Sequence, residues 1–458
     1  MKLQFSHLFF IDKKVFPEHK LQLHEAHHKK TAWVYFATLA LGFWLIANPL
    51  TFEYQQTAML WSDLITGLLV IIFSIVALSP YRLWAQWILV FLGIWLFIAP
   101  MVFWTKESSA LLLDYLTGTL LITFGLIVPG QPGLKLYEQS GPNVPKGWDY
   151  NPSSWSERVP VIFLSWVGFF VARYMGAFQL EIIDTAWDPF FGNGTEKVLT
   201  SDVSHAFPVS DALLGAFSYL FDILFAYAGN SHRWRTMPWV VILFGILIIP
   251  LGIVSITLII LQPLAVGFWC TLCLVSAMVS LIMIPFAVDE VLATLQLIRY
   301  EKKERNTPFW TVFWFGGTME GSMEKDKEPN RLFPYTLKGN KKDILSRPWN
   351  LFLSLLVGMW VMASPAILDF EGPFADHNNV AGALIITFGI IAMSDVARSV
   401  RLMNVIVGLW LIVIPWTLDI NHDVSFWSSI LSGVAIIFLS IRKGIIGEKR
   451  GGFENHVI

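Results

Sequence analysis

About twelve apolar runs, each as long as a helix that crosses a bilayer, divide this chain. Crossing the hydrocarbon layer takes about 20 apolar residues in a helix, and only helices and closed barrels satisfy their backbone polar groups there. Hydrophobic residues make up 55% of the sequence and charged residues only 14%, with a mean hydropathy of +0.57. The sequence therefore predicts an all-α integral membrane protein, a polytopic helical bundle of about 12 transmembrane helices. The expected spans are 31–49, 63–78, 83–102, 111–128, 159–180, 208–227, 238–261, 267–288, 349–368, 380–396, 402–418 and 426–441.

The charges between these spans predict an orientation. In a twelve-span arrangement the basic residues, such as Arg82, Lys303 and Arg442, fall on one side, and carboxylates such as Asp188 and Asp423 fall on the other. By the positive-inside rule we expect a multi-pass protein of the cell inner membrane with both termini in the cytoplasm. The net charge of −2 gives no reason to expect a nucleic-acid partner, so the lipid bilayer is the main surrounding.

A repeated pattern marks both ends of the membrane region. Gly-x-Trp-x4-Pro occurs four times, and each proline is followed 17 or 18 residues later by a glycine in the next span. The proline stops or kinks a helix near the outer end, and small glycines permit close helix packing. Each unit is therefore expected to be a helical hairpin. The four patterns begin at Gly42, Gly93, Gly358 and Gly408, and the later glycines are Gly67, Gly118, Gly382 and Gly433.

These hairpins resemble the SPW-repeat membrane family. The resemblance rests on the two-span unit and on the proline-centred Ser364-Pro365 and Pro415-Trp416, and it covers about 31–130 and 347–445. It implies membrane embedding without a defined activity. Because apolar and aromatic spans without buried charge usually serve packing, we expect the repeats to be scaffold or interaction surface.

The chain has only two cysteines, Cys270 and Cys273, in the Trp-Cys-Thr-Leu-Cys sequence that begins at Trp269. This spacing, with no other cysteine, favours a redox-active dithiol or disulfide. The apolar run after Cys273 places the pair on the first turn of a helix, where the thiolate is favoured. No metal is expected, because a closed zinc site takes four ligands and the nearest histidines are His205 and His232. Two buried thiols without a function remain the alternative.

The central unit, 159–298, resembles the vitamin K epoxide reductase family and its bacterial disulfide-generating relatives. The resemblance rests on the Trp-Cys-x-x-Cys-Leu motif and on the first outer loop, which includes Lys-Val-Leu-Thr-Ser from Lys197. It implies a four-helix membrane bundle in which the cysteine pair exchanges electrons with a quinone of the menaquinone or ubiquinone type. It also implies that Cys270 meets the thiol substrate and that Cys273 lies nearer the quinone.

By this resemblance the first outer loop covers the quinone. The hydroxyls of Ser201 and Ser204 are suited to donate to a quinone oxygen, and equally suited to cap the following helix. The expected quinone-binding residues are Ser201, Ser204, Phe207 and Trp269.

The first outer loop also departs from the family. Relatives commonly carry two cysteines there that pass electrons to a thioredoxin-like partner, whereas Thr195 stands at one of these places and no further cysteine exists. Pro208 and Ser210 replace the usual glycine and proline. Either a periplasmic thiol protein or a small thiol reaches Cys270 directly, or the redox role has been lost.

Four further residues are candidates for moving or balancing charge. Arg173 and Asp222 lie inside spans, where charged groups usually find a partner, and they are expected to pair with each other or with Asp211 and Glu181. His205 in the outer loop is a candidate for handling protons, as histidines often do near neutral pH. A purely structural role is the alternative for all four. The set is Arg173, His205, Asp211 and Asp222.

The function predicted from these features is quinone-linked thiol-disulfide oxidoreduction at the outer face of the inner membrane, with the cysteine pair facing the periplasm. The alternative is a non-catalytic membrane scaffold or transporter-like protein that keeps a degenerate redox core. The polar stretches between the modules are expected to be linkers, although 308–315 is apolar enough to lie along the membrane surface. The expected organisation is an N-terminal tail 1–30, repeats 31–130, a linker 131–158, the central domain 159–298, a linker 299–346, repeats 347–445 and a tail 446–458.

Overall fold

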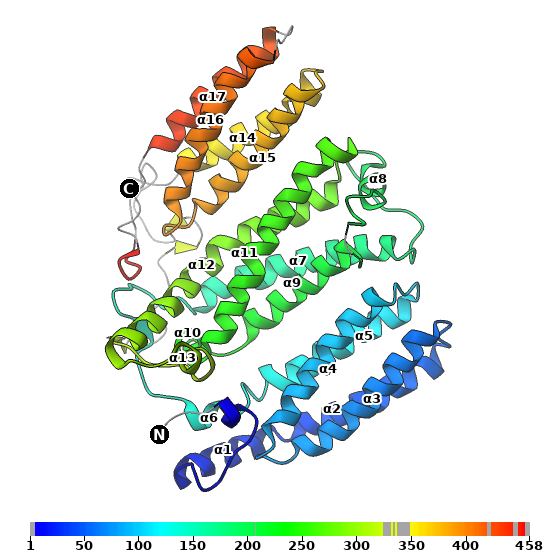
Figure 1. Cartoon of the computed structure of the whole chain (residues 1–458), viewed down its shortest axis with the longest axis vertical. Coiled ribbons are helices and arrows are strands. Elements are labelled where there is room, and N and C mark those ends of the chain that lie inside the picture. The colour runs from blue at the N-terminus through cyan, green and yellow to red at the C-terminus, as the bar shows by residue number, and fades with distance from the viewer. Residues whose placement is uncertain are drawn as a thin grey trace.

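The protein is all-α and its long helices form three groups that lie side by side (Figure 1). Eleven helices in the described part of the chain are long and apolar enough to cross a membrane. The predicted fold class, an all-α polytopic membrane protein, is therefore confirmed. The computed structural model describes residues 5–206, 208–323, 331–332, 335–336, 349–418, 423–442 and 448–453.

The first group is a pair of helical hairpins. Its helices begin and end close to the predicted spans, and the fourth continues through a π-helical turn, η2. The helices are α2 (Trp33–Thr51), α3 (Thr57–Ala77), α4 (Leu83–Val102), α5 (Ser108–Ile122) and η2 (Thr123–Ile127).

The third group repeats this arrangement near the other end of the chain. It packs against the central group through α15. Its helices are α14 (Trp349–Ile367), α15 (Pro373–Ile391), α16 (Met403–Thr417) and α17 (Asp423–Ile441).

The repeat glycines meet in pairs and set the close approach within each hairpin. A Cβ atom on Gly42 would lie 2.9 Å from the carbonyl oxygen of Gly67, and a Cβ on Gly67 would lie 2.8 Å from that of Gly42. The same reciprocal contact joins Gly93 to Gly118, Gly358 to Gly382 and Gly408 to Gly433. The prediction that these glycines serve close helix packing is confirmed.

The middle group, here called the central bundle, consists of four long helices. One of them, α9, has 17 residues and corresponds to the expected span 208–227, which is not among the eleven candidate spans. This helix packs between α7 and α11 and also contacts the first repeat pair through α4, α5 and η2. The bundle helices are α7 (Trp155–Gln179), α9 (Asp211–Tyr227), α11 (Pro238–Leu261) with its π-helical end η3 (Gln262–Val266), and α12 (Thr271–Arg305).

Most of the remaining short elements lie at one end of the long helices, the end near the N and C marks in Figure 1. We call this end the α1 side. The short helix α8 (Gly194–Leu199) marks the opposite end of the central bundle, which we call the α8 side. The other short elements are η1 (Phe5–Leu8), α1 (Glu18–Thr31), α6 (Leu134–Tyr137), β1 (Val144–Pro145), α10 (Arg233–Thr236), α13 (Phe309–Phe315), β2 (Gly321–Ser322), β3 (Arg331–Leu332), β4 (Tyr335–Thr336) and η5 (Arg398–Leu402).

The segments expected to be simple linkers are folded against the bundle. In the stretch 131–158, Tyr150 and Ser153 are buried, and β1 pairs in antiparallel fashion with β2 from the second such stretch. The apolar segment 308–315 forms α13, whose Val312 is buried while Trp310 is exposed. Simple linkers are therefore the wrong description, because their apolar and polar side chains find partners in the bundle.

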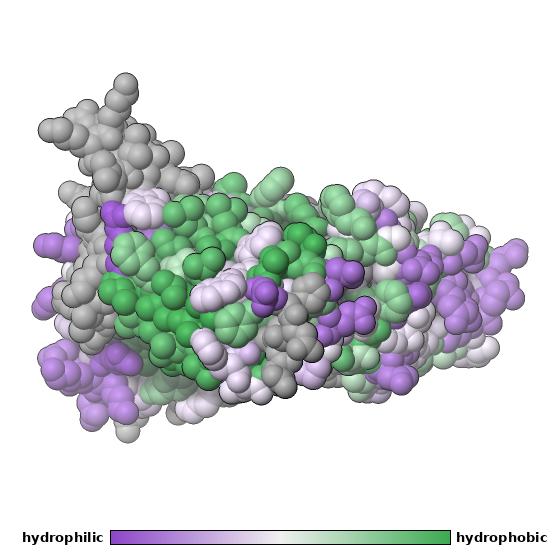
Figure 2. Space-filling model, turned by 90° about the horizontal axis from the view of Figure 1, so that it is seen from above, coloured by the Kyte–Doolittle hydropathy of each residue, from purple (hydrophilic) through white to green (hydrophobic). Residues whose placement is uncertain are grey.

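A hydrophobic surface with hydrophilic ends matches a membrane setting. Figure 2 shows a broad hydrophobic area bordered by hydrophilic residues at both ends of the molecule. Large apolar side chains that face outward on the repeats, such as Phe43, Trp61 and Phe438, contribute to this kind of surface. The multi-pass membrane character follows from this surface and from the eleven candidate spans.

Candidate functional site

The two cysteines begin helix α12 and are joined in a disulfide. Cys270 is the N-cap residue, and its Sγ accepts a hydrogen bond from the backbone N–H of Cys273 at 3.1 Å. The side chain of Gln262 fixes the entry to the helix, because its Oε1 accepts from the Cys270 N–H at 3.0 Å. The pair therefore occupies the first turn of a long apolar helix, as the sequence predicts.

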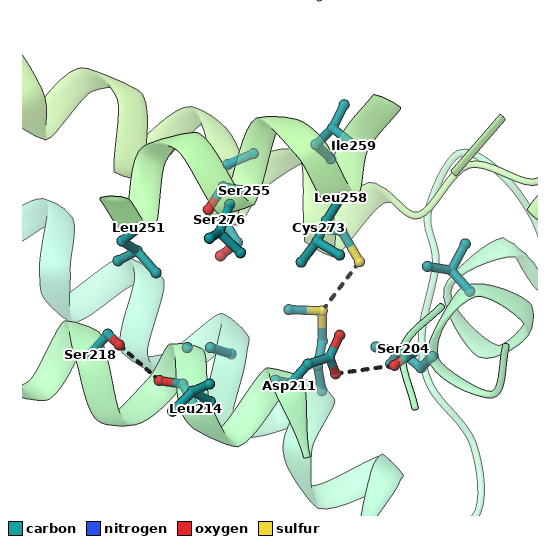
Figure 3. A pocket seen from close by; sticks show the side chains of 18 of the residues that line it. Ser204, Asp211, Leu214, Ser218, Leu251, Ser255, Leu258, Ile259, Cys273 and Ser276 are labelled. Atoms are coloured by element: carbon teal, nitrogen blue, oxygen red, sulfur yellow. Dashed lines mark hydrogen bonds between the residues drawn. The ribbon is translucent and has the colours of Figure 1, made fainter. Parts of the chain in front are cut away.

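The two sulfurs have different surroundings. Cys270 is 0% exposed, whereas Cys273 is half-buried and lines a cavity of about 490 Å³ between helices of the central bundle. Figure 3 shows Cys273 pointing into this cavity beside Leu258, and its Sγ lies 3.7 Å from the Sδ of Met175. A cavity of this size is in the range that holds a small organic ligand. Only Cys273 is therefore placed to meet a molecule in this space, which we call the cysteine cavity.

A small polar network closes the α8 side of the cysteine cavity. The amide of Gln179 donates to the Oδ1 of Asp211 at 2.5 Å and to the Oγ of Ser204 at 2.5 Å. Ser204 donates to the same carboxylate oxygen at 3.1 Å, and Ser210 donates to the Oε1 of Gln179. This network joins the end of α7, the outer loop and the start of α9, so it fixes a polar patch beside an otherwise apolar cavity.

A second polar contact lies deeper in the cavity. The hydroxyl of Tyr219 bonds to the Ser276 carbonyl at 2.7 Å and to the Ser280 hydroxyl at 2.6 Å. Gly168 makes room for this ring, because a Cβ there would lie 2.6 Å from it. Tyr219 of α9 and Ser276 of α12 both line the cysteine cavity together with Cys273.

The carboxylate of Asp188 ties the outer loop to the cysteine helix. It accepts from the Thr195 hydroxyl at 2.6 Å and from the Thr271 hydroxyl at 2.5 Å, and Thr271 is the residue directly after Cys270. It also accepts backbone N–H groups of Thr195, Thr271 and Phe191. Although burial raises the pKa of this carboxyl, these hydrogen bonds outweigh it and hold the pKa well below its usual range.

The loop lies directly on the cysteine motif. A Cβ on Gly194 would lie 2.0 Å from the Trp269 carbonyl oxygen, so only glycine fits this contact. Lys197 places its Nζ 3.6 Å from the centre of the Phe268 ring. We call residues 186–206 the cover segment, because they lie over the buried Cys270 and one border of the cysteine cavity.

Comparison with known proteins decides how this arrangement is classified. Residues 159–288 match the model of the vitamin K epoxide reductase family. Residues 32–128 and 348–443 match the SPW repeat domain. No curated protein and no solved structure matches the chain. Both resemblances seen in the sequence are therefore confirmed, and the vitamin K epoxide reductase domain supports a thiol oxidoreductase kind of function in the membrane.

The predicted site residues of the vitamin K epoxide reductase domain fall into two sets. Ser201, Ser204 and Asp211 line the cysteine cavity with Cys273. Ser201 donates its hydroxyl to the Val198 carbonyl at 2.7 Å, so both serine hydroxyls are engaged within the protein. Trp269 lies outside the cavity lining and packs near the Phe191 ring. Phe207 lies outside the described residues.

The intramembrane charges are not paired as expected. Asp222 is fully buried in α9 without a hydrogen-bond partner among the described residues, and the structure forms no ion pair between it and Arg173 there. Arg173 instead acts electrostatically on Tyr115 of the first repeat pair. Glu181 pairs with Lys106, an exposed contact between the two modules.

His205 also faces the first repeat pair. Its ring stacks on Trp104 with centroids 6.4 Å apart, and its Nδ1 bonds to the Ser201 carbonyl at 3.0 Å. The ring is exposed and does not line the cysteine cavity. Its side chain therefore lies at the junction between the vitamin K epoxide reductase domain and the repeats.

Sequence reasoning missed a second polar cluster, inside the first repeat pair. Asp63 and Asp114 are both 0% exposed, which corrects the expectation of repeats without buried charge. Their carboxyl groups lie close to each other and to the Tyr54 hydroxyl, yet none of these groups has a hydrogen-bond partner among the described residues. A signal was present, because each aspartate lies four residues before a repeat glycine; the same positions in the second repeat pair hold Asn378 and Ser429.

Three other residues were missed for different reasons. Gln179, Asp188 and Tyr219 hold the cysteine cavity and its cover together, yet none belongs to a spaced motif. Asp188 is one of several acidic residues in the same loop, and only the fold brings it to Thr271.

Proposed function

We propose that this protein is a quinone-linked thiol-disulfide oxidoreductase of the vitamin K epoxide reductase type. Cys270 and Cys273 form its redox pair, and a membrane quinone of the menaquinone or ubiquinone type accepts the electrons. The observation that carries this proposal is the position of the Cys273 sulfur in the wall of a largely apolar cavity, next to a disulfide partner that does not line it. The family match to residues 159–288 supports the same chemistry.

The thiol half of the reaction begins at Cys270. A substrate thiolate attacks the Cys270 sulfur, the disulfide breaks, and Cys273 leaves as a thiolate in the cavity. A second substrate thiolate then attacks the mixed disulfide and releases Cys270 together with the oxidised substrate. Two electrons are now stored on the cysteine pair, and two substrate thiols have become one disulfide.

The quinone half restores the disulfide. The two cysteine thiolates lose two electrons and re-form the disulfide, and a quinone in the cysteine cavity gains these electrons with the two protons that the substrate thiols released, to become a quinol. Asp211 and Ser204 line the same cavity as Cys273 and are hydrogen-bonded to each other, so they are suited to pass protons. The helix N-terminus favours the Cys273 thiolate, because its N–H groups carry partial positive charge.

The thiol substrate reaches Cys270 only when the cover segment moves. Cys270 is 0% exposed, and Gly194 lies against the Trp269 carbonyl directly before it. The cover is held to the cysteine helix by hydrogen bonds from Thr271 to Asp188 and not by a covalent bond. A periplasmic thiol protein or a small thiol is the proposed substrate, since the chain has no further cysteine to serve as a relay.

The same proposal gives an orientation in the inner membrane. The α1 side carries basic residues such as Lys30, Arg235 and Lys302, which fits a cytoplasmic location by the positive-inside rule. The α8 side, with the cysteine pair, then faces the periplasm, where disulfides persist. A membrane-impermeant thiol reagent applied to intact cells after mild reduction tests this orientation, and failure to label either cysteine contradicts it.

The redox state of the cysteine pair tests the function. In purified membranes, alkylation followed by a gel shift is expected to show a pair that is reduced by added dithiol and reoxidised by added quinone. Cys273→Ala and Cys270→Ala are expected to abolish quinone-dependent thiol oxidation, because each removes one half of the disulfide. A pair that stays reduced whatever the quinone overturns the proposal and favours a non-catalytic scaffold or transporter-like role.

A further inference from the structure

A second cavity of about 430 Å³ lies between the first repeat pair and the central bundle. Helix α4 and the π-helical turn η2 line it on one side, and α9 and α11 line it on the other. Its lining is entirely apolar and rich in aromatic rings, among them Trp87, Phe221 and Trp239. Half of this cavity is therefore built by the SPW repeats and not by the vitamin K epoxide reductase domain.

The second cavity adjoins the cysteine cavity. Three residues, Phe217, Ile246 and Leu247, line both spaces. On α9, Phe217 lies between Asp211, which lines the cysteine cavity, and Phe225, which lines the second cavity. Asp211 and Phe225 are 14 positions apart, about 21 Å of helix, which is most of the hydrocarbon thickness of a bilayer.

The polarity of the lining changes from the cysteine cavity to the second cavity. One end holds the Cys273 sulfur and the polar network of Gln179, Ser204 and Asp211, whereas the other end has no polar lining. A molecule that fits both ends has a polar, redox-active head and a long apolar tail. Helices α4 and η2 contact α9 directly, so the first repeat pair is fixed in place as the far wall.

We propose that the second cavity binds the isoprenoid tail of the quinone whose ring meets Cys273. The first repeat pair then serves as a receptor for the tail and selects quinones by the length and shape of that tail. This inference rests on the proposed function, since it places the tail of the same substrate. The tail leaves an apolar bilayer for an apolar groove, so packing against the aromatic rings and not the hydrophobic effect supplies its binding energy.

Variants that fill the second cavity test the proposal. Ile94→Trp on α4 and Leu243→Trp on α11 place bulk in this space, while Ile253→Trp adds the same side chain to an exposed position of α11. With a quinone that carries a multi-isoprenoid tail, the first two variants are expected to raise KM about tenfold with little change in kcat. With a tailless quinone, all three are expected to match the wild type.

A binding measurement gives a readout that does not depend on turnover. A quinone with a photoreactive group at the end of its isoprenoid tail is expected to cross-link to α4, η2, α9 or α11, and excess unlabelled tailed quinone is expected to compete. Cross-links confined to the second repeat pair overturn the proposal, as does competition by phospholipid without competition by quinone. The proposal is also overturned if Ile94→Trp raises KM equally for tailed and tailless quinones.

The two proposals fail in different ways. If the wild type oxidises thiols with neither quinone, the proposed function is wrong. If tailless and tailed quinones both react and the cavity-filling variants leave both reactions unchanged, the oxidoreductase stands and the tail site is wrong.

Discussion

At the scale of single residues, hydrogen bonds to Asp188 order the outer loop and tie it to the cysteine helix. The hydroxyl and N–H of Thr195 both donate to Asp188. The same carboxylate accepts from Thr271 inside the cysteine motif. The cover segment is therefore clamped to the redox motif by one ionised group, and it can open without any change in oxidation state.

Asp188→Asn is expected to loosen the cover segment. An amide nitrogen donates and does not accept, so the variant loses acceptors for the Thr195 and Thr271 donors. After reduction of the disulfide, the rate of Cys270 alkylation is expected to rise about tenfold relative to the wild type. Asp184→Asn, at an exposed position of the same loop, is the control and is expected to leave the rate unchanged. An unchanged rate in Asp188→Asn contradicts the clamp.

Single residues also show which parts of the candidate site could be predicted from the sequence. Cys270 and Cys273 were predictable because a lone Cys-x-x-Cys pair is typical of redox chemistry, and the apolar run after them places them on a helix start. Gln179 and Asp188 were not predictable, since their partners come from distant segments that only the fold brings together. The pairing expected between Arg173 and Asp222 failed for the same reason, because the fold leaves the Asp222 carboxyl without a hydrogen-bond partner among the described residues.

At the scale of elements, the four repeat hairpins share one packing rule and differ in one buried position. The glycine pairs were predictable because they recur at a fixed spacing. The position four residues before the second glycine is Asp63, Asp114, Asn378 or Ser429, and all four side chains are buried. In the second repeat pair these side chains bond to neighbours, Asn378 to Ser364 and Ser429 to the Leu411 carbonyl. In the first pair the two positions hold the carboxyl groups of Asp63 and Asp114, which lie close to each other.

Substitution of Asp114 is expected to show whether this pair shares a proton. Two carboxylates in contact in a low dielectric cannot both be ionised without a large cost. Asp114→Asn keeps a polar side chain of nearly the same size next to Asp63 and is expected to leave the free energy of unfolding within about 0.5 kcal/mol. Asp114→Ala leaves a buried void beside Asp63 and is expected to lower the free energy of unfolding by about 2 kcal/mol.

Thermal unfolding in detergent measures both variants. Ser429→Ala is the matched control at the same repeat position, and it loses only one hydrogen bond to a carbonyl. If Asp114→Asn destabilises the protein as much as Asp114→Ala, the two groups do not share a proton, and another ligand holds them together.

Helix α1 is docked by histidines whose state depends on pH. The Nε2 of His24 bonds to the Pro80 carbonyl at 2.8 Å, and that of His28 bonds to the Ala77 carbonyl at 3.0 Å. Burial lowers the pKa of both imidazoles, and neighbouring His27 contributes to the lowering. The docked helix therefore favours neutral imidazoles that donate from Nε2.

The docking of α1 is expected to weaken in mild acid. When α1 is undocked, its histidines take up protons near a pKa of about 6.5, whereas the docked form takes them up only at lower pH. Docking is therefore at full strength above about pH 6.5 and weakens as the pH falls below it. Hydrogen exchange of the 18–31 amides is expected to speed up between about pH 7.5 and 5.5, after correction for intrinsic exchange rates. The double variant His24→Gln, His28→Gln is expected to lose this dependence.

At the scale of the whole molecule, the two repeat pairs stand on either side of the central bundle, and a buried ionic network joins the modules on the α1 side. Arg450 donates to Asp289 of α12 at 2.9 Å and to Asp395, which follows α15, at 2.6 Å. It also contacts the Tyr150 hydroxyl from the segment before α7. Two carboxylates and one hydroxyl from three segments thus converge on one arginine, an arrangement that apolar patterning could not predict, because these partners lie up to 300 residues from Arg450 in the chain.

Arg450→Ala is expected to destabilise the joined modules. Removing one partner of a buried ionic network leaves Asp289 without its cation and costs about 3 kcal/mol. Thermal unfolding is expected to shift to lower temperature, and limited proteolysis is expected to cut the 131–158 segment more readily. Lys449→Ala is the control, because that exposed residue bonds to Asp149 only through its backbone N–H and carbonyl groups. Equal stability of the two variants contradicts a joining role for Arg450.

The position of Arg450 in the chain has a consequence for biosynthesis. Asp289 leaves the ribosome 161 residues ahead of the arginine that neutralises it, and all the described membrane helices are synthesised in the interval or before it. Domains generally fold as units in the order of synthesis, so the central bundle and the second repeat pair insert before the ionic junction between them is complete. The joining of these two modules is therefore a late event, and a nascent chain that stalls after α17 carries an open junction at its cytoplasm-side surface in the proposed orientation.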